Sequence, residues 1–296
     1  MWTASRWNEY EVLDASKGEK LERWGNYTLL RPDPQIIWNT PHLCPEWDNL
    51  NGHYHRSNRG GGEWEMHNLP EEWELHYVLP APVNHKLTFH LKPFAFKHTG
   101  VFPEQAANWD WFSELIKRRT NEGREVHVLN LFAYTGGATI AAAAAGANVT
   151  HVDASKGMVQ WAKENASSSG LADCPIRWLV DDCKKFVERE IRRGKTYDAV
   201  IMDPPSYGRG PKGEIWKIEE SIFPLVEETV KLLSDEPLFF LINSYTTGLQ
   251  PATLQYIIGT TVQKKFNGTS EASELGIPVS STGLILPCGA AGRWTI

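Results

Sequence analysis

The sequence predicts an α/β protein in which a doubly wound, mostly parallel sheet follows a smaller β-rich region. From residue 124 onward, apolar segments of strand length alternate with segments of helical period, as in βα units around a buried parallel sheet. Before residue 97, short runs alternate apolar and polar residues between turn-forming residues, as in antiparallel strands. We therefore expect two domains, a β-rich N-terminal domain (1–97) that helps to dock substrate and an α/β domain (98–296).

The composition is that of an ordinary globular protein, with 41% hydrophobic and 22% charged residues in a chain of 296. A net charge of -6 argues against non-specific coating of nucleic acid, although it allows a local basic groove. The four cysteines lie far apart, which predicts neither a disulfide framework nor a zinc site and favours a reducing, cytoplasmic location. The chain has no apolar run of about 20 residues and no signal-peptide pattern, so we expect no membrane partner.

Residues before position 100 include seven of the 13 tryptophans and eight of the ten histidines. The clearest strands of the N-terminal region are residues 26–31, 73–78 and 86–91, and residues 58–62 form a glycine-rich loop. Pairs such as His53 and His55 could ligate a metal, but no acid or cysteine supplements them at a recognised metal-site spacing. We therefore expect ordinary histidines of a β domain and no metal.

The α/β region begins with a helix from Pro103 to about Thr120. Five buried strands then follow at residues 126–131, 148–153, 176–180, 197–203 and 238–243. The expected helices between and after them are residues 138–145, 156–168, 184–193, 218–233 and 251–266. Two short final strands, residues 276–280 and 283–286, predict an antiparallel hairpin at one edge, giving seven strands in total.

The fourth strand ends abruptly at Asp203, because Pro204 and Pro205 have no backbone N–H to continue a ladder. Asp203 therefore lies at the carboxyl edge of the sheet, where open α/β sheets bind ligands. A loop with Tyr207 and three glycines follows. A plain strand-to-loop turn, with Asp203 as a local acceptor, is the structural alternative.

The ends of the first three strands also carry ligand-type residues. The first strand runs into Gly136-Gly137 without the Gly-x-Gly-x-x-Gly pattern, which favours an adenosine ligand without phosphates over a dinucleotide. Asp153 ends the second strand and can accept both ribose hydroxyls, and Asp181-Asp182 ends the third and can accept from an adenine amino group. Each acid alone could be a helix cap, but their conjunction on successive strands is more specific.

Four segments together resemble the class I S-adenosylmethionine-dependent methyltransferases, a family with a Rossmann-like sheet. They are Phe-Ala-Tyr-Thr-Gly-Gly (132–137), Val-Asp-Ala-Ser (152–155), Asp-Asp (181–182) and Asp-Pro-Pro-Ser-Tyr (203–207). More narrowly, they are similar to the bacterial group that methylates large-subunit ribosomal RNA on guanine N7 or cytosine C5. Residues 98–105 also resemble a segment that precedes the cofactor domain in that group. The resemblance covers residues 94–250.

The resemblance implies S-adenosylmethionine as cofactor and RNA, in rRNA processing, as substrate. The cofactor-binding residues it implies are Phe132, Thr135, Gly136, Gly137, Asp153, Ser155, Asp181, Asp182 and Asp203, with Thr99, Phe102 and Gln105 from the upstream segment. Asp203, Pro204 and Tyr207 would face the methyl acceptor. The Arg that often follows the Gln in this group is Ala106 here.

The chain lacks the cysteine that cytosine-C5 enzymes carry after the fifth strand and has Ser244-Tyr245-Thr246 there. Carbon C5 needs a thiolate to add to the ring, whereas a nitrogen already has a lone pair. Cys183 follows the third strand and reads better as a small buried residue. We therefore expect methylation of a base nitrogen, with guanine N7 and an exocyclic amine both open.

The basic residues near the predicted site are candidates for phosphate contacts. Arg209 and Lys212 lie in the loop after Asp203, and a basic run at 184–195 is better explained as a solvated helix face. Three alternatives remain: a cofactor-binding module without catalysis, a methyltransferase of a protein or small molecule, and a nicotinamide-dependent oxidoreductase. The sequence leaves the oligomeric state open.

Overall fold

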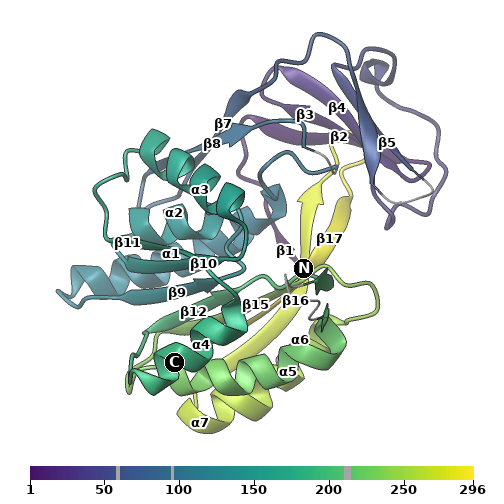
Figure 1. The fold of residues 1–296 in the computed structure, drawn as a ribbon. Coiled ribbons are helices and arrows are strands. Elements are labelled where there is room, and N and C mark those ends of the chain that lie inside the picture. The colour runs from purple at the N-terminus through teal and green to yellow at the C-terminus, as the bar shows by residue number, and fades with distance from the viewer. Residues whose placement is uncertain (58–60, 95–96, 210–214) are drawn as a thin grey trace.

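The computed structural model describes residues 1–57, 61–94, 97–209 and 215–296 (Figure 1). It confirms the predicted fold class: a mostly parallel sheet with helices on both faces, next to a β-rich N-terminal region. Within these residues no helix combines the length and apolar character needed to cross a bilayer.

The large sheet has eight strands in the order β1-β16-β17-β15-β12-β9-β10-β11. Its parallel centre consists of β9 (His127–Leu131), β10 (Asn148–Asp153), β11 (Ile176–Val180), β12 (Ala199–Met202) and β15 (Phe239–Ser244). The antiparallel pair β16 (Thr269–Pro278) and β17 (Ile285–Thr295) joins beside β15. The strand order reverses between β9 and β12, so their carboxyl ends open the crevice in which such sheets bind ligands.

Helices cover the two faces of this sheet in separate apolar layers. The first layer contains α1 (Ala106–Asn121), α2 (Gly137–Ala144) and α3 (Lys156–Ser168). Its buried apolar residues belong to the same core as those of the β-rich region. The second contains α4 (Cys183–Arg192), α5 (Ile218–Thr229) and α6 (Pro251–Ile258). Short helical turns extend these elements, namely η2 (Pro103–Gln105), η3 (Val230–Leu232), η4 (Gly259–Gln263) and α7 (Lys264–Phe266).

The N-terminal region contains a five-stranded sheet and a separate hairpin. The sheet has the order β2 (Tyr10–Ser16), β3 (Glu19–Trp24), β4 (Tyr27–Pro32), β5 (Gly52–Arg56) and β6 (Gly62–Met66), with the short η1 (Pro45–Asp48) between β4 and β5. The hairpin of β7 (Trp73–Val78) and β8 (Lys86–Leu91) lies along α3, where the Asn165 side chain accepts from the His90 backbone N–H at 2.8 Å. Of the predicted loop, residues 58–60 lie outside the described residues.

The two regions are joined through strands from both ends of the chain. The eighth strand of the large sheet is β1 (Trp2–Thr3), which pairs with β16 and was not predicted because two residues carry no periodicity. The turn between β16 and β17 reaches the β-rich sheet, where the Ser280 N–H donates to the Val12 carbonyl at 2.9 Å (Figure 1). One continuous apolar core includes Trp24 from β3 and Phe239 from β15. The domain boundary at residue 97 stays a prediction.

The final hairpin is much longer than the predicted 276–280 and 283–286, and β1 lies outside it. Its strand β17 runs beside β15 with Gly289 and Gly292 in its centre. A Cβ at Gly289 would lie 2.9 Å from the Tyr245 ring, and one at Gly292 would lie 2.8 Å from Ile258. Close neighbours, rather than strand propensity, therefore explain the small residues that hid this strand in the sequence.

Candidate active site

A cavity of about 620 Å³ lies where the carboxyl ends of the parallel strands face the β-rich region. The large sheet lines it with residues that follow β9, β10, β11 and β12, namely Phe132, Tyr134, Asp153, Ala154, Ser155, Asp182, Cys183, Asp203, Pro204, Pro205 and Ser206. The opposite wall comes from other segments, namely Lys20, Arg31, Asp33, Pro34, Gln35, Lys97, His98, Val101, Phe102, Pro103, Glu104, Tyr245 and Cys288. The strand ends that the sequence predicts to form one site therefore lie around one cavity.

The loop after β9 turns sharply to expose two aromatic side chains to the cavity. Phe132 and Tyr134 both have left-handed backbone angles, with φ of 55° and 50°, and Gly136 follows with φ of 83°. A Cβ on Gly136 would lie 2.8 Å from the Ala162 Cβ, and one on Gly137 would lie 2.8 Å from the Trp109 ring. The two glycines therefore let α2 pack closely against its neighbours, while the aromatic residues line the cavity.

Thr135 lies under this loop, in a second, small cavity of about 50 Å³ that also touches Gly137 and Gln105. Its hydroxyl donates to the Gly100 carbonyl, and its carbonyl accepts from the Asn165 side chain at 2.9 Å. The role of Thr135 in the described structure is to tie the loop to the segment before η2.

Asp153 has the geometry expected of a ribose-binding carboxylate. Its two oxygens accept from the backbone N–H groups of Tyr134 and Ser155, each at 2.8 Å, which fixes the carboxylate at the cavity wall. Each oxygen retains a lone pair for a hydroxyl group, so a vicinal diol fits this donor-poor site. Burial raises the pKa of Asp153, and the two backbone hydrogen bonds partly oppose that rise. The side chain of Ser155 caps α3 at the same wall by accepting from Met158 N.

The acidic pair after β11 divides its work. Asp182 lines the cavity and caps α4, accepting from the Lys185 N–H at 2.9 Å. Asp181 lies outside the cavity lining and forms an ion pair with Arg189 on α4. Only Asp182 is therefore placed to meet a ligand in this cavity, while Asp181 holds α4 against the end of β11.

Asp203 lies at the end of β12 with a second carboxyl group nearby. Burial, together with the charge of Glu104 from η2, raises the pKa of Asp203 to about 7. Burial likewise raises the pKa of Glu104, and both residues line the cavity. The Tyr245 hydroxyl, after β15, accepts from the Gln105 side chain at 2.7 Å beside them. Asp203 can therefore be protonated or ionised near neutral pH, and its ionised form can accept a hydrogen bond from an amine.

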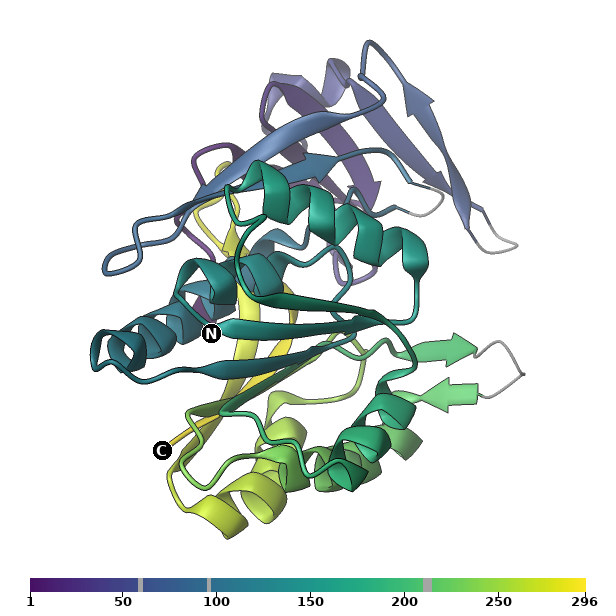
Figure 2. The same ribbon diagram turned by 60° about the vertical axis from the view of Figure 1, so that its left-hand side comes forward.

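The loop after Asp203 turns back as a short hairpin, β13 (Tyr207–Arg209) and β14 (Ile215–Lys217), which projects from the sheet edge (Figure 2). Pro204 lines the cavity, and the Pro205 carbonyl accepts from the indole of Trp216 at 2.6 Å. Tyr207 is 51% exposed on this hairpin, outside the cavity lining. Lys212 and the side chain of Arg209 lie outside the described residues.

The upstream segment contributes unequally. Phe102 lines the cavity, with its ring centroid 5.5 Å from that of Tyr134 and 5.4 Å from that of Tyr245. Gln105 lines only the small cavity, and Thr99 is fully buried, with no hydrogen-bond partner for its hydroxyl among the described residues. Of these three residues, Phe102 is the one that lines both cavities, as does its neighbour Val101.

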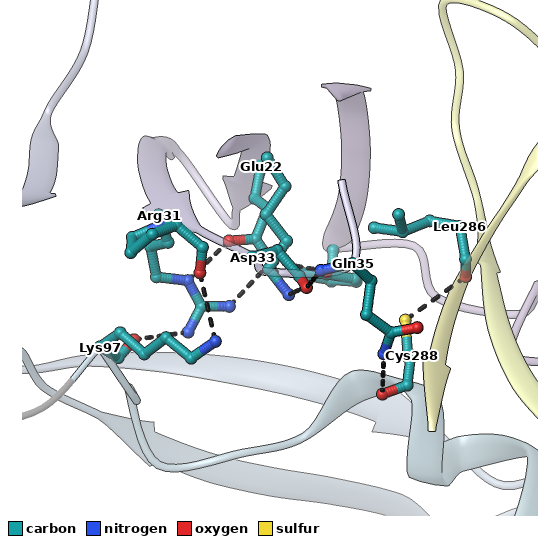
Figure 3. A network of polar contacts seen from close by, with 10 residues as sticks. Glu22, Arg31, Asp33, Gln35, Lys97, Leu286 and Cys288 are labelled. Carbon is teal, nitrogen blue, oxygen red and sulfur yellow. Dashed lines mark hydrogen bonds and ion pairs between the residues drawn. The ribbon is translucent and has the colours of Figure 1, made fainter. Parts of the chain in front are cut away.

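The β-rich wall of the cavity was missed by the sequence reading. Arg31 donates from Nε and Nη2 to the carboxylate of Glu22, at 2.6 Å and 2.8 Å (Figure 3). Lys20 lies 3.4 Å from Asp33. Burial alone would raise the pKa of Glu22, but Arg31 and Lys20 lower it to about 2. No short motif marks these residues, because their shared position depends on pairing between strands far apart in sequence.

In the β-rich sheet, the fold brings an acid next to His53 and His55, which the spacing in the sequence did not predict. His53 and His55 on β5 and Glu65 on β6 bring one ligand-type atom each to within 4.8 Å of one another. Each is already paired, His53 with Glu19 and His55 with Glu65, both at 2.7 Å. This cluster is not part of the cavity lining.

The fold and the cavity define a class of protein, a Rossmann-like α/β protein with a ligand-sized cavity at the carboxyl ends of its parallel strands. Residues 51–217, more than half of the chain, match the family of S-adenosylmethionine-dependent methyltransferases. A crystal structure of a SAM-dependent methyltransferase from Agrobacterium tumefaciens is 34% identical, with a TM-score of 0.87 over 97% of this chain and 90% of that one. The chain belongs to this family, so the nicotinamide alternative is not supported.

Curated relatives are similar over shorter stretches. Ribosomal RNA large subunit methyltransferase K/L of Shewanella frigidimarina is 34% identical over 110 residues, 36% of this chain and 15% of that protein. The protein of the same name from Cellvibrio japonicus is 27% identical over 191 residues, 64% of this chain and 24% of its own length. The chain thus spans about a quarter or less of the length of these relatives.

Proposed function

We propose that this chain transfers the methyl group of S-adenosylmethionine to a nitrogen of an RNA base, with large-subunit ribosomal RNA as the substrate class. The names of the curated relatives support the substrate class. The observation that carries the chemistry is Asp203 at the end of β12, facing the same cavity as Asp153 and Tyr134. RNA reaching such a cavity must present a single base turned out of its stack.

The cysteines of the cavity favour nitrogen over carbon. Cys183 and Cys288 both line it, and burial raises the pKa of each thiol. Cys183 Sγ accepts from the Phe132 N–H at 3.2 Å, and Cys288 Sγ donates to the Leu286 carbonyl at 3.4 Å. A protonated, hydrogen-bonded thiol is a poor nucleophile, so addition to a pyrimidine ring has no activated cysteine among the described residues.

The residues of the chain hold the proposed reactants as follows. Phe132, Tyr134, Asp153 and Asp182 would hold the cofactor, which supplies an electrophilic methyl group on sulfur. Asp203 and the Pro204 carbonyl accept N–H bonds from the base, which aims the nitrogen lone pair at the methyl carbon. Tyr207 on the β13–β14 hairpin would stack on the extruded base.

Asp203 further favours an exocyclic amine over guanine N7. An exocyclic amine that accepted the methyl group, with the carbon–sulfur electron pair left on the cofactor sulfur, would then have to lose a proton. A carboxylate with a pKa of about 7 can accept that proton at neutral pH. Guanine N7 has no proton to lose and would not need this group.

The experiment compares ribosomal RNA nucleosides by mass spectrometry from cells with and without the protein. The expected result is the loss of one N-methylated nucleoside, restored by the unmutated gene. In a radiolabelled-methyl assay, Asp203→Ala should lower incorporation about 100-fold or more while S-adenosylhomocysteine still binds. Asp173→Ala, an exposed acid outside the cavity lining, is the matched control. Unchanged nucleosides and no incorporation into any RNA would refute the proposal.

A further inference from the structure

The wall of the cavity opposite the sheet holds three cations, and two carboxylates form ion pairs with them. The cations are Lys20, Arg31 and Lys97, and the paired carboxylates are Asp33 and Glu22, the latter outside the cavity lining. Arg31 is fully engaged by Glu22, and Lys20 lies 3.4 Å from Asp33 and 3.7 Å from Glu22. Among the described residues, Lys97 has no carboxylate within 4.0 Å, and its ammonium group donates only to the Pro32 carbonyl.

Lys97 is held in place rather than free to swing. Arg31 Nη1 donates to the Lys97 carbonyl at 2.8 Å, and Lys97 Nζ donates to the Pro32 carbonyl at 3.2 Å (Figure 3). Residues 97 and 31–32 thus clamp each other across 65 residues of sequence. The Gln35 side chain fixes the same wall to β17 by donating to the Cys288 carbonyl at 3.2 Å. A cation fixed in this way has little side-chain entropy left to lose on meeting a ligand.

A second donor stands next to it. His98 lines the cavity, and its ring makes no hydrogen bond within the described part of the chain, only an aromatic contact with Phe102 at 5.0 Å. Burial, with the charges of Arg31 and Lys97, lowers the pKa of His98 to about 3, so the ring is neutral and can donate one N–H. Burial and Lys20 lower the pKa of Lys97 to about 8, which still leaves it mainly charged at pH 7.

Half-buried cations are costly unless an anion compensates them. The carboxyl group of Glu104 also lines the cavity, but among the described residues it forms no ion pair with a cation of this wall. We propose that Lys97 and His98 form an oxyanion site in the active cavity, which binds a phosphate of the acceptor nucleotide or the carboxylate of the cofactor. The phosphate source rests on the proposed function; the carboxylate source does not. A local site of this kind would give an acidic protein a charge-assisted contact with its ligand.

The test uses the full chain and three variants. Lys97→Met removes the charge but keeps most of the stem, and Lys97→Arg keeps the charge. Lys86→Met is the control of equal charge change, because Lys86 is exposed on β8 and does not line the cavity. Circular dichroism and thermal unfolding establish that each variant is folded before binding is measured.

The first measurement is calorimetric titration with S-adenosylhomocysteine and with 5′-methylthioadenosine, which lacks the carboxylate. If the cofactor carboxylate occupies the site, Lys97→Met weakens S-adenosylhomocysteine about tenfold and 5′-methylthioadenosine not at all. The second measurement is RNA affinity against salt. If a phosphate occupies the site, Lys97→Met lowers the slope of log affinity against log salt by about one. In either case Lys97→Arg restores most of the effect.

The proposal is overturned if a folded Lys97→Met variant matches Lys86→Met in both measurements. It is also overturned if Lys97→Arg shows the same loss as Lys97→Met in the measurement that detects a loss. Neither measurement requires methyl transfer. If the unmutated protein methylates no RNA, the proposed function fails, while the titration with the two adenosine ligands still decides whether an oxyanion binds here.

Discussion

The two sides of the active cavity are built in different ways. On the sheet side, Asp153, Asp182 and Asp203 end neighbouring strands, and backbone groups within a few residues fix the first two. On the β-rich side, Lys20, Glu22, Arg31 and Lys97 fix one another through side-chain pairs between strands and a distant linker. One side therefore depends on local backbone geometry, and the other on buried charge.

Removing one member of the charged wall should have the largest effect on stability. Arg31→Met leaves the fully buried Glu22 carboxylate without its bidentate partner, so we expect a loss of about 3–5 kcal/mol in the free energy of unfolding. Denaturant titration measures it. The control is Arg23→Met on β3, whose ion pair with Glu11 is about one-third exposed and should cost about 1 kcal/mol or less.

The pH dependence of that difference gives a further check. The pKa of Glu22 is lowered to about 2, so the stability it contributes is present above its unfolded value and is lost as pH falls through 2. The gap between the unmutated protein and Arg31→Met should therefore narrow in acid. Equal losses for Arg31→Met and Arg23→Met would show that the wall is not held by buried charge.

On the sheet side, a substitution that strains the backbone of the loop after β9 should cause the loss of stability. Gly136→Ala places a side chain at φ of 83° and 2.8 Å from the Ala162 Cβ, so we expect a loss of about 2–4 kcal/mol and weaker S-adenosylhomocysteine binding. Gly157→Ala in the first turn of α3 is the matched control, because its Cβ would meet only Ser155 Oγ at 3.9 Å. An unchanged denaturation midpoint for Gly136→Ala would contradict this account of the loop.

The smallest effect should be a shift in the pH dependence of kcat/KM, where the two sides meet at Asp203 and Glu104. Because the pKa of Asp203 is raised to about 7, its ionised form, the proposed acceptor of the amine proton, gains population as pH rises through 7. We expect kcat/KM to rise over that range, and Glu104→Gln to shift the rise to lower pH. Because the pKa of Asp203 is higher in the folded than in the unfolded state, its protonated form stabilises the fold. This contribution is fully present below the pKa of the unfolded state and is lost as pH rises through 7. A profile unmoved by Glu104→Gln would contradict the coupling.

The sheet side of the cavity could be predicted because short patterns determine it. Parallel strands place their carboxyl ends at one edge, so Asp153 and Asp203 could be assigned to one site from the strand order alone. The same patterns do not distinguish residues that face a ligand from those that support the loop. Gly136 faces Ala162, and Asp181 faces Arg189, although both belong to the motifs that the sequence singled out.

The β-rich wall could not be predicted because no local pattern brings Lys20, Asp33 and Lys97 together. Their meeting requires the pairing of β3 with β4 and the return of the chain at residue 97. The length of the final hairpin, β16 and β17, was underestimated for a related reason. In β17 the small residues fit against Tyr245 and Leu254, and this complementarity is absent from the strand's own periodicity.

The position of β17 has a consequence for how the enzyme is made on the ribosome. This strand follows every other strand in chain order, yet it lies inside the sheet between β15 and β16 and supplies Cys288 to the cavity. Until it has been synthesised, β15 has an open edge and the wall around Gln35 lacks its anchor. The cavity is therefore complete only after β17 has been made and has joined the sheet.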